Sequence, residues 1–248
     1  MTDTWLYSLG SVFLVSLVSL IGIFTISIKL ENLKKILIYL VSFSAGALLG
    51  GAFIHLIPEI TESMGFGMEV SMAILLGILF SFVLEKVVRW RHCHDPDCSE
   101  HRSLAYMNLV GDAVHNFMDG IIIAAAYLVS IPVGIATTIA VLFHEIPQEI
   151  GDFGVLLYAG FSKKKVLLFN FLSALTAVLG ALMMLLLSTV VEGAVSFLVP
   201  FAAGMFIYIA GSDLIPELHK EREPKKSVFQ FIAFVLGILV MASLMFLE

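Results

Sequence analysis

Two short runs of residues, His-Asn-Phe-Met-Asp at 115–119 and His-Glu-Ile-Pro-Gln-Glu at 144–149, combine imidazole, carboxylate and amide side chains. Both runs lie inside apolar segments of membrane length. Insertion of a charged, unpaired carboxylate into the middle of a membrane costs about 2.5–3.5 kcal/mol of free energy. Asp119, Glu145 and Glu149 therefore need a nearby positive charge, and neither segment contains a lysine or an arginine. A metal cation bound by these groups is the simplest source of that charge. The two runs thus predict transport of a divalent metal ion through a membrane.

Each run is part of a longer polar stripe, because residues three or four apart share one face of a helix. The stripes consist of Asp112, His115, Asn116 and Asp119 in one segment, and of His144, Glu145, Gln148, Glu149 and Asp152 in the other. Only residues 130–134 separate the two segments, so we expect antiparallel helices whose stripes face each other. Imidazole with carboxylates suits zinc, iron and manganese better than magnesium or calcium. The alternative is a buried polar network whose members satisfy one another.

Pro147 lies inside the second stripe. Its missing N–H removes the helical hydrogen bond to the carbonyl of Phe143, and the helix is expected to kink there. A free carbonyl at this depth is tolerated where it lines a polar cavity. Pro58 and Pro216 are expected to act similarly near opposite mouths of the pathway.

Long apolar segments must position these stripes. Hydrophobic residues make up 59% of the 248 residues and the mean hydropathy is +1.00, which is too apolar for a soluble domain of this length. A membrane helix needs about 20 predominantly apolar residues, and continuous apolar runs favour helices over a barrel. We place eight spans at 5–28, 36–58, 69–88, 104–129, 133–159, 166–190, 194–216 and 228–247. The prediction is one all-α integral membrane domain over residues 1–248, in contact with a lipid bilayer.

The basic residues indicate the orientation of the spans. All 14 lysines and arginines lie in, or at the edges of, the connections that follow spans one, three, five and seven. The positive-inside rule places these connections in the cytoplasm and both termini outside, which requires an even number of spans. Cys93 and Cys98 then lie on the cytoplasmic side and are expected to be reduced thiols. Nothing in this pattern predicts a nucleic-acid partner.

An internal repeat is visible at the ends of two spans. Span two ends in His55-Leu-Ile-Pro-Glu59 and span seven in Asp213-Leu-Ile-Pro-Glu217. The predicted topology makes these spans cross in opposite directions. Spans one to three and six to eight would then be inverted copies around the four–five pair, as in many secondary transporters. The alternative is that Leu-Ile-Pro-Glu is simply a common way to end a membrane helix.

The two runs together, His-Asn-Phe-Met-Asp-Gly at 115–120 and His-Glu-Ile-Pro-Gln-Glu-Ile-Gly-Asp at 144–152, resemble the paired signature of the ZIP (Zrt-, Irt-like protein) family of metal transporters. The resemblance covers essentially the whole chain. It implies a binuclear site at mid-membrane and movement of metal into the cytosol.

The resemblance also implies which residues bind metal. One ion would be bound by His115, Asp119, His144, Glu145 and Gln148, and a second would share Asp119 and Glu145 and add Asn116, with Asn170 or Ser173 as further candidates. Glu149 belongs to the motif and points either to metal or to the exit path. Similar members of the family often have histidine in place of Gln148. The expected cargo is zinc, with iron(II), manganese(II) and cadmium as the other candidates.

Polar residues near the ends of the spans extend the predicted pathway. His55 and Glu59 lie at the outer end of span two, where carboxylates raise the local cation concentration. Towards the cytoplasm we expect a relay from the site to the cytosol, formed by Asp112, Asp152, Asp213, Glu217 and His219. Each of these residues could equally be an ordinary polar group at the end of a helix.

The cytoplasmic connection at 89–103 is rich in histidine and cysteine. It contains His92, Cys93, His94, Cys98 and His101. Such tracts often bind metal, but this spacing matches no closed zinc motif, so a loose or regulatory site is expected. The alternative is a solvated, disordered loop.

Two enzyme classes compete with transport. His144-Glu145-x-x-Gln148 is one residue away from the H-E-x-x-H pattern of zinc proteases, which suggests an intramembrane metal-dependent hydrolase. The second histidine is missing, however, and Pro147 disturbs the helix. The second class is a di-metal oxidase, but this sequence lacks the paired Glu-x-x-His pattern of such enzymes. We therefore predict a transporter that works by alternating access, and not an enzyme. The compact loops indicate a prokaryotic plasma membrane. A homodimer is a candidate assembly.

Overall fold

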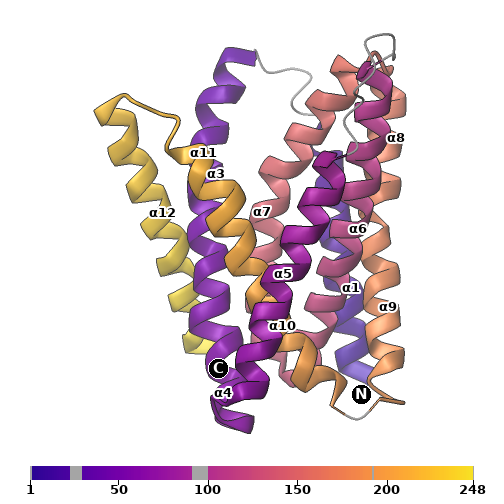
Figure 1. The fold of residues 1–248 in the computed structure, drawn as a ribbon, viewed down its shortest axis with the longest axis vertical. Coiled ribbons are helices and arrows are strands. Elements are labelled where there is room, and N and C mark those ends of the chain that lie inside the picture. Colours follow the sequence, from indigo (N-terminus) through magenta and orange to yellow (C-terminus); the bar gives the residue numbers. More distant parts are fainter. Residues whose placement is uncertain (1, 23–29, 91–99, 192, 248) are drawn as a thin grey trace.

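The computed structural model describes residues 2–22, 30–90, 100–191 and 193–247. These residues form helices joined by short turns, and no strand occurs among them, which confirms the predicted all-α fold. The long helices run side by side as one bundle (Figure 1).

The helices of the described residues form eight units of membrane length. In chain order they are α1 (Thr2–Val18) with η1 (Ser19–Ile21); α3 (Leu30–Gly50) with η2 (Gly51–Leu56) and α4 (Ile57–Met64); α5 (Met68–Trp90); α6 (Glu100–Val129); α7 (Ile131–Tyr158); α8 (Lys163–Ala174) with α9 (Thr176–Leu187); α10 (Ala194–Tyr208) with η3 (Ile209–Leu214) and α11 (Ile215–Leu218); and α12 (Pro224–Leu244) with η4 (Met245–Leu247).

Seven of these units are long and apolar enough to cross a membrane. The other unit, α7, has 28 residues but carries the polar run 144–149. Each of the eight predicted spans therefore corresponds to a helical unit, and most boundaries differ by a few residues. The last span begins at Pro224 rather than at 228, because proline fits the first turn of a helix. Residues 23–28, predicted as the end of the first span, lie outside the described part of the chain.

The repeated Leu-Ile-Pro-Glu sequence has the same local structure in both places. η2 and η3 are both six-residue π-helices, and each leads directly into a helix, α4 or α11, with proline in its first turn. π-Helices are rare and occur mostly as single turns, often at functional sites. Two of them at matching positions make a chance similarity of the two sequences a poor explanation.

The helix pairs beside these segments match as well. In each pair two glycines lie against a backbone carbonyl of the partner helix, and the contacts are Gly46–Phe234 and Gly237–Phe43 between α3 and α12, and Gly204–Ile74 and Gly77–Phe201 between α10 and α5. Aligning the two Leu-Ile-Pro-Glu motifs places Gly46 on Gly204 and Phe43 on Phe201. In Figure 1, α3 runs from the top of the molecule to the bottom and α10 runs from bottom to top. The predicted inverted repeat is confirmed.

α6 and α7 lie between the two halves of this repeat and are antiparallel neighbours, as predicted. Only Ser130 separates them. Its hydroxyl accepts a hydrogen bond from the N–H of Val133, 3.3 Å away, and proline follows in the first turn, so the start of α7 is well defined. α7 ends before Gly160, whose φ of +84° favours glycine. The two polar stripes are thus held on a rigid helical hairpin.

Candidate metal site

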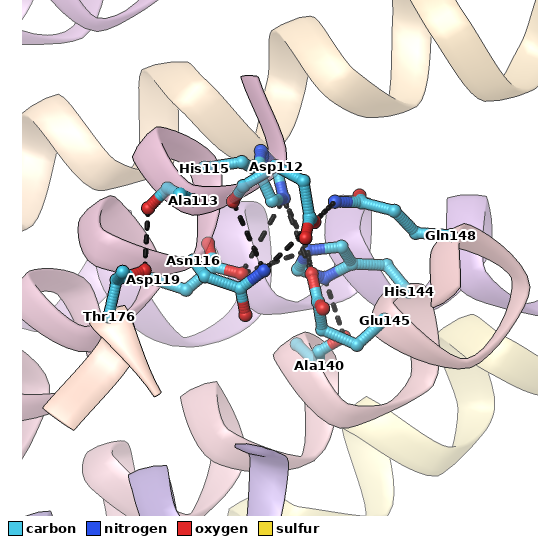
Figure 2. Close-up of polar contacts among 10 residues, drawn as sticks. All are labelled: Asp112, Ala113, His115, Asn116, Asp119, Ala140, His144, Glu145, Gln148 and Thr176. Atoms are coloured by element: carbon cyan, nitrogen blue, oxygen red, sulfur yellow. Dashed lines mark hydrogen bonds and ion pairs between the residues drawn. The ribbon is translucent and has the colours of Figure 1, made fainter. Parts of the chain in front are cut away.

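Four side chains from the two stripes converge between α6 and α7. They are His115 and Asp119 of α6 and His144 and Glu145 of α7, and one ligand atom of each lies within 4.8 Å of the others. We call this group the tetrad. Figure 2 shows its members pointing toward one another from the two helices.

The spacing within the tetrad suits a small metal ion. The two Nε2 atoms are 3.1 Å apart, and each lies 3.3–3.5 Å from Oδ2 of Asp119 and Oε1 of Glu145. A tetrahedral zinc ion with bonds of about 2.0–2.1 Å separates its ligands by roughly 3.3–3.4 Å. The distances between the two imidazoles, and between each imidazole and each carboxylate, are therefore close to those of tetrahedral ligands.

The tetrad is buried, and its carboxylates are not satisfied by the protein. Asp119, Glu145 and His144 are 0%, 1% and 2% exposed, whereas the His115 side chain is 15% exposed. Among the described residues, only the imidazole Nε2 atoms approach Oδ2 of Asp119 and Oε1 of Glu145, at 3.3–3.5 Å, and Oδ1 of Asp119 has no hydrogen-bond partner. A polar network that satisfied itself would also supply a donor to Oδ1 of Asp119, so this buried oxygen favours a cation as the ligand.

A backbone contact orients His144. Its Nδ1 lies 3.3 Å from the carbonyl oxygen of Ala140, one turn earlier in α7. A ring nitrogen facing a carbonyl must carry the proton, so the lone pair of Nε2 faces the tetrad. Metal-binding histidines in proteins are commonly held in this way.

The predicted loss of a hydrogen bond at Pro147 is compensated from another helix. Ser44 of α3 is buried, and its hydroxyl lies 2.6 Å from the carbonyl oxygen of Phe143, to which the missing N–H of Pro147 would otherwise donate. The same hydroxyl lies 2.8 Å from the carbonyl oxygen of Leu40 in its own helix, and the shorter distance favours donation to Phe143. The Phe43 and Phe143 rings also pack edge to face, with centroids 4.5 Å apart. Ser44 thus fixes α7 to α3 directly before the tetrad residues of α7. The sequence offers no motif around Ser44 that would have revealed this.

Replacing Ser44 by alanine should destabilise the protein by about 1–3 kcal/mol, the usual cost of leaving a buried carbonyl without a donor. Ser42 is a matched control, because its buried hydroxyl bonds only to Ile38 of its own helix, 2.7 Å away. Thermal unfolding in detergent micelles should give a clearly lower melting temperature for Ser44→Ala than for Ser42→Ala. Equal melting temperatures would show that the contact with Phe143 contributes nothing.

Two amide residues expected in the metal site contact Asp112. Nδ2 of Asn116 and Nε2 of Gln148 donate to Oδ1 of Asp112, at 2.9 and 3.2 Å (Figure 2). Asp112 lies one turn before Asn116 in α6, and its carboxylate attracts both amide donors. The structure therefore brings together four of the predicted ligands and leaves Asn116 and Gln148 in contact with Asp112.

Three further predicted residues, Glu149, Asn170 and Ser173, lie where α7 and α6 meet α8. Nδ2 of Asn170 is 3.4 Å from the backbone oxygen of Glu149, and the Ser173 hydroxyl is 3.3 Å from the backbone oxygen of Leu109. All three are buried, and within the described part of the chain neither oxygen of the Glu149 side chain has a hydrogen-bond partner. None of them belongs to the tetrad.

Of the two residues predicted at the entrance, His55 is the more deeply buried. His55 is 2% exposed, and its Nε2 lies 2.8 Å from the carbonyl oxygen of Met241 in α12. It therefore links η2 to α12 within the protein. Glu59 is only partly buried, one turn further along α4.

Two cavities are each lined both by a histidine of the tetrad and by residues of η3 or α11. A cavity of about 170 Å³ is lined by His115, Gln148 and Asp213. A second cavity of about 230 Å³ is lined by His144, Gln148, Asp213 and Glu217. The predicted relay residues Asp213 and Glu217 therefore face the same spaces as the histidines of the tetrad.

Sequence reasoning missed a polar pair in the smaller cavity. Glu85 of α5 and Tyr208 of α10 both line it, and the Tyr208 hydroxyl donates to Oε2 of Glu85 at 2.5 Å. The sequence did contain a feature that could have predicted Glu85, because it is a carboxylate inside an apolar segment. Asp152, another residue of the predicted relay, accepts a hydrogen bond from Nδ2 of Asn108 of α6 at 2.8 Å.

The histidine- and cysteine-rich connection is described only at its ends. α5 continues to Trp90 and α6 begins at Glu100, so parts of the predicted loop 89–103 are helical. Residues 91–99, and with them His92, Cys93, His94 and Cys98, lie outside the described residues. His101 lies in the first turn of α6.

Comparison with known proteins shows extensive similarity. Residues 2–94 and 90–245 match the family model described as ZIP Zinc transporter. Zinc transporter ZIP13 of Pongo abelii is 31% identical over 259 residues, which cover 96% of this chain and 78% of that protein. Zinc transporter zipt-7.1 of Caenorhabditis briggsae is 31% identical, with coverage of 94% and 77%. Zinc transporter SLC39A7 of Mus musculus is 28% identical, with coverage of 98% and 70%.

Proposed function

The chain belongs to the ZIP zinc transporter family, and from this premise we propose that it transports zinc across a membrane through the tetrad. The observation that carries the proposal is the tetrad itself, in which one ligand atom of each of two imidazoles and two carboxylates lies within 4.8 Å of the others in a buried place. Borderline metals such as zinc favour this mixture of nitrogen and oxygen ligands.

The position of Gln148 bears on the choice of metal. Histidine in its place would add a third imidazole, so glutamine suggests a weaker preference for zinc. In the structure, however, the Gln148 amide faces Asp112 and the four tetrad ligands are complete without it. Relatives of this chain are named zinc transporters. Both points favour zinc as the cargo over iron(II), manganese(II) or cadmium.

The family is one of transporters and not of enzymes, which removes the intramembrane hydrolase as an alternative. The similar proteins named above come from animals and lend no support to a prokaryotic plasma membrane. The homodimer stays a prediction.

We propose that zinc leaves the tetrad through the two cavities lined by Asp213 and that the α11 end of the bundle faces the cytoplasm. Support comes from the positions of lysines, which occur near the end of α5 and at the starts of α8 and α12. These three helix ends lie at the end of the molecule opposite the two chain termini (Figure 1). The positive-inside rule places that end in the cytoplasm.

The inverted repeat favours alternating access, with the α6–α7 pair moving relative to the rest. A cross-link between α3 and α7, beside Ser44, should then block flux and leave zinc binding intact. Unchanged flux through the cross-linked protein would exclude such a motion.

Zinc entry into liposomes that contain a zinc-sensitive dye tests the transport proposal. The variant His144→Ala, Glu145→Ala removes two of the four ligands. Mutation of a residue that only orients a metal ligand already lowers metal affinity or activity about 10–100-fold. We therefore expect the double variant to lose more than about 99% of the zinc flux. Asp3→Asn, an exposed change in the first turn of α1, is the control. Full flux through a folded double variant would place the route elsewhere.

A further inference from the structure

Two polar side chains lie inside the apolar stretch of α5, a helix that carries none of the tetrad. They are Ser81 and Glu85, and between Met72 and Lys86 every other residue is apolar or glycine. Ser81 and Glu85 are one turn apart, so they share one face of α5. Ionisable residues within membrane spans usually face the protein interior or a water-filled cavity, and they mark ion pathways. This face of α5 is therefore a candidate part of the zinc route.

Both side chains line the smaller cavity, whose volume is about 170 Å³. His115 and Gln148 line the same cavity from the α6–α7 hairpin, and Asp213 lines it from η3. His115 is also the most exposed member of the tetrad. A cavity of this volume has room for several water molecules. An ion that leaves the tetrad past His115 thus enters a space that α5 borders with a hydroxyl and a carboxylate.

The Ser81 hydroxyl indicates that this cavity holds a polar occupant. Ser81 is 7% exposed, and its Oγ has no hydrogen-bond partner among the described residues. Helical serines commonly donate to the carbonyl one turn earlier, as Ser42 and Ser71 do here. Buried polar atoms rarely go without any partner. The partner of the Ser81 hydroxyl is therefore expected to be water or an ion within the cavity that Ser81 lines.

Tyr208 of α10 fixes the position of the Glu85 carboxylate. Its hydroxyl donates to Oε2 of Glu85 at 2.5 Å, and both residues line the cavity. A carboxylate offers about four acceptor positions, so Glu85 can bind a cation while it accepts this hydrogen bond. The bond also holds the long Glu85 side chain in one conformation beside the cavity. Tyr208 thereby prepares Glu85 to bind a cation.

The inverted repeat shows that the corresponding place in the other half is filled by protein. The glycine contacts that relate the two helix pairs place Tyr208 of α10 on Gly50 of α3. They place Ser81 of α5 on Met241 of α12. Met241 is fully buried and packs directly against Gly50, and its carbonyl oxygen lies 2.8 Å from Nε2 of His55. The same helix pairing is thus closed in one half and contains a polar-lined cavity in the half proposed to open to the cytoplasm.

We propose that Ser81 and Glu85 bind zinc transiently after it leaves the tetrad, and that Tyr208 is the positioning residue for Glu85. This inference rests on the proposed exit of zinc through the cavity. Zinc would exchange its tetrad ligands for the Glu85 carboxylate, the Ser81 hydroxyl and water. Zinc binds well to imidazole nitrogen, and this second set contains none, so it holds the ion more weakly and lets it pass on.

Zinc flux into liposomes and the visible absorption of bound Co²⁺ separate transit from binding at the tetrad. Tetrahedral Co²⁺ with nitrogen ligands reports the tetrad of the purified full-length protein. Glu85→Gln should lower the maximal zinc flux about tenfold or more and leave the Co²⁺ spectrum and affinity unchanged. Glu85→Asp keeps the charge and should retain more flux than Glu85→Gln. Glu223→Gln is the charge-matched control, because Glu223 is an exposed partner of Lys226 at the same end of the bundle.

Tyr208→Phe tests the positioning role with a smaller change. It removes the hydroxyl and keeps the ring that packs against Phe82, so flux should fall severalfold with an unchanged Co²⁺ spectrum. Native flux through Glu85→Gln, with transport by the native protein intact, overturns this inference and leaves the proposed function standing. Absence of zinc flux through the native protein overturns both. If Glu85→Gln loses the Co²⁺ spectrum together with the flux, Tyr208→Phe decides, and native flux through that variant overturns the inference.

Discussion

Asparagine in place of Asp119 is expected to abolish tight zinc binding while the zinc-free protein stays folded. Asp119 is fully buried, and its Oδ2 lies 3.5 and 3.3 Å from the imidazoles of His115 and His144. The amide keeps the volume of the side chain and removes its charge and one ligand oxygen. Losing one partner of a buried charged interaction costs about 2–5 kcal/mol. The zinc dissociation constant should therefore rise by roughly 30-fold to several thousand-fold.

Thermal unfolding with and without zinc measures this effect. Zinc at a hundred times its dissociation constant stabilises a folded protein by about 2.7 kcal/mol, so the native protein and the control Asp3→Asn should melt at a higher temperature in zinc. Asp119→Asn should show almost no zinc-dependent change and a zinc-free melting temperature close to native. A purely structural polar network predicts the opposite, namely a lower zinc-free melting temperature and no effect of zinc on the native protein.

The sequence predicts the helices and the tetrad well, because both depend on strong and local signals. Unbroken apolar runs determine the spans, and a spacing of three or four residues determines which groups share a face. His115 and Asp119 are one turn apart, and the short connection at Ser130 makes α7 the neighbour of α6. The register of the two stripes then follows from the hairpin.

The sequence predicts less well which polar residues of a stripe meet. Asn116 shares a face with both Asp112 and Asp119, and its side-chain rotamer decides which carboxylate it contacts. The side-chain rotamer of Gln148 likewise decides whether its amide contacts Asp112 of the facing helix or the tetrad. These rotamers depend on small differences in hydrogen-bond geometry, which cannot be predicted from helical periodicity.

Contacts from distant helices are also invisible in the sequence. Ser44 donates to the carbonyl that Pro147 leaves free, and His55 bonds to Met241 in the last span rather than facing an entrance. These contacts depend on the packing of spans far apart in the chain. The Leu-Ile-Pro-Glu repeat was visible, but the π-helices that precede both copies have no sequence signature of their own.

Leucine in place of Gly180 is expected to disrupt the site although Gly180 touches none of its ligands. Gly180 of α9 lies directly against the backbone carbonyl of Phe117 in α6, and Gly120 of α6 lies in the same way against Ala177. Any Cβ at position 180 would overlap with that carbonyl oxygen. The helices must therefore separate, and α6 carries His115 and Asp119 with it.

The expected result for Gly180→Leu combines lower stability with lost metal binding. Overpacking of a buried contact typically costs about 1–3 kcal/mol, and a shift of about 1 Å in a functional group can reduce activity on the order of 100-fold. Zinc flux should fall much more steeply than the melting temperature, because the tetrad needs ligand separations near 3.3 Å. Gly10→Leu is the matched control, since Gly10 is an exposed helical glycine with no atom near its Cβ position. Normal zinc flux through Gly180→Leu would mean that the α6–α9 contact does not set the geometry of the tetrad.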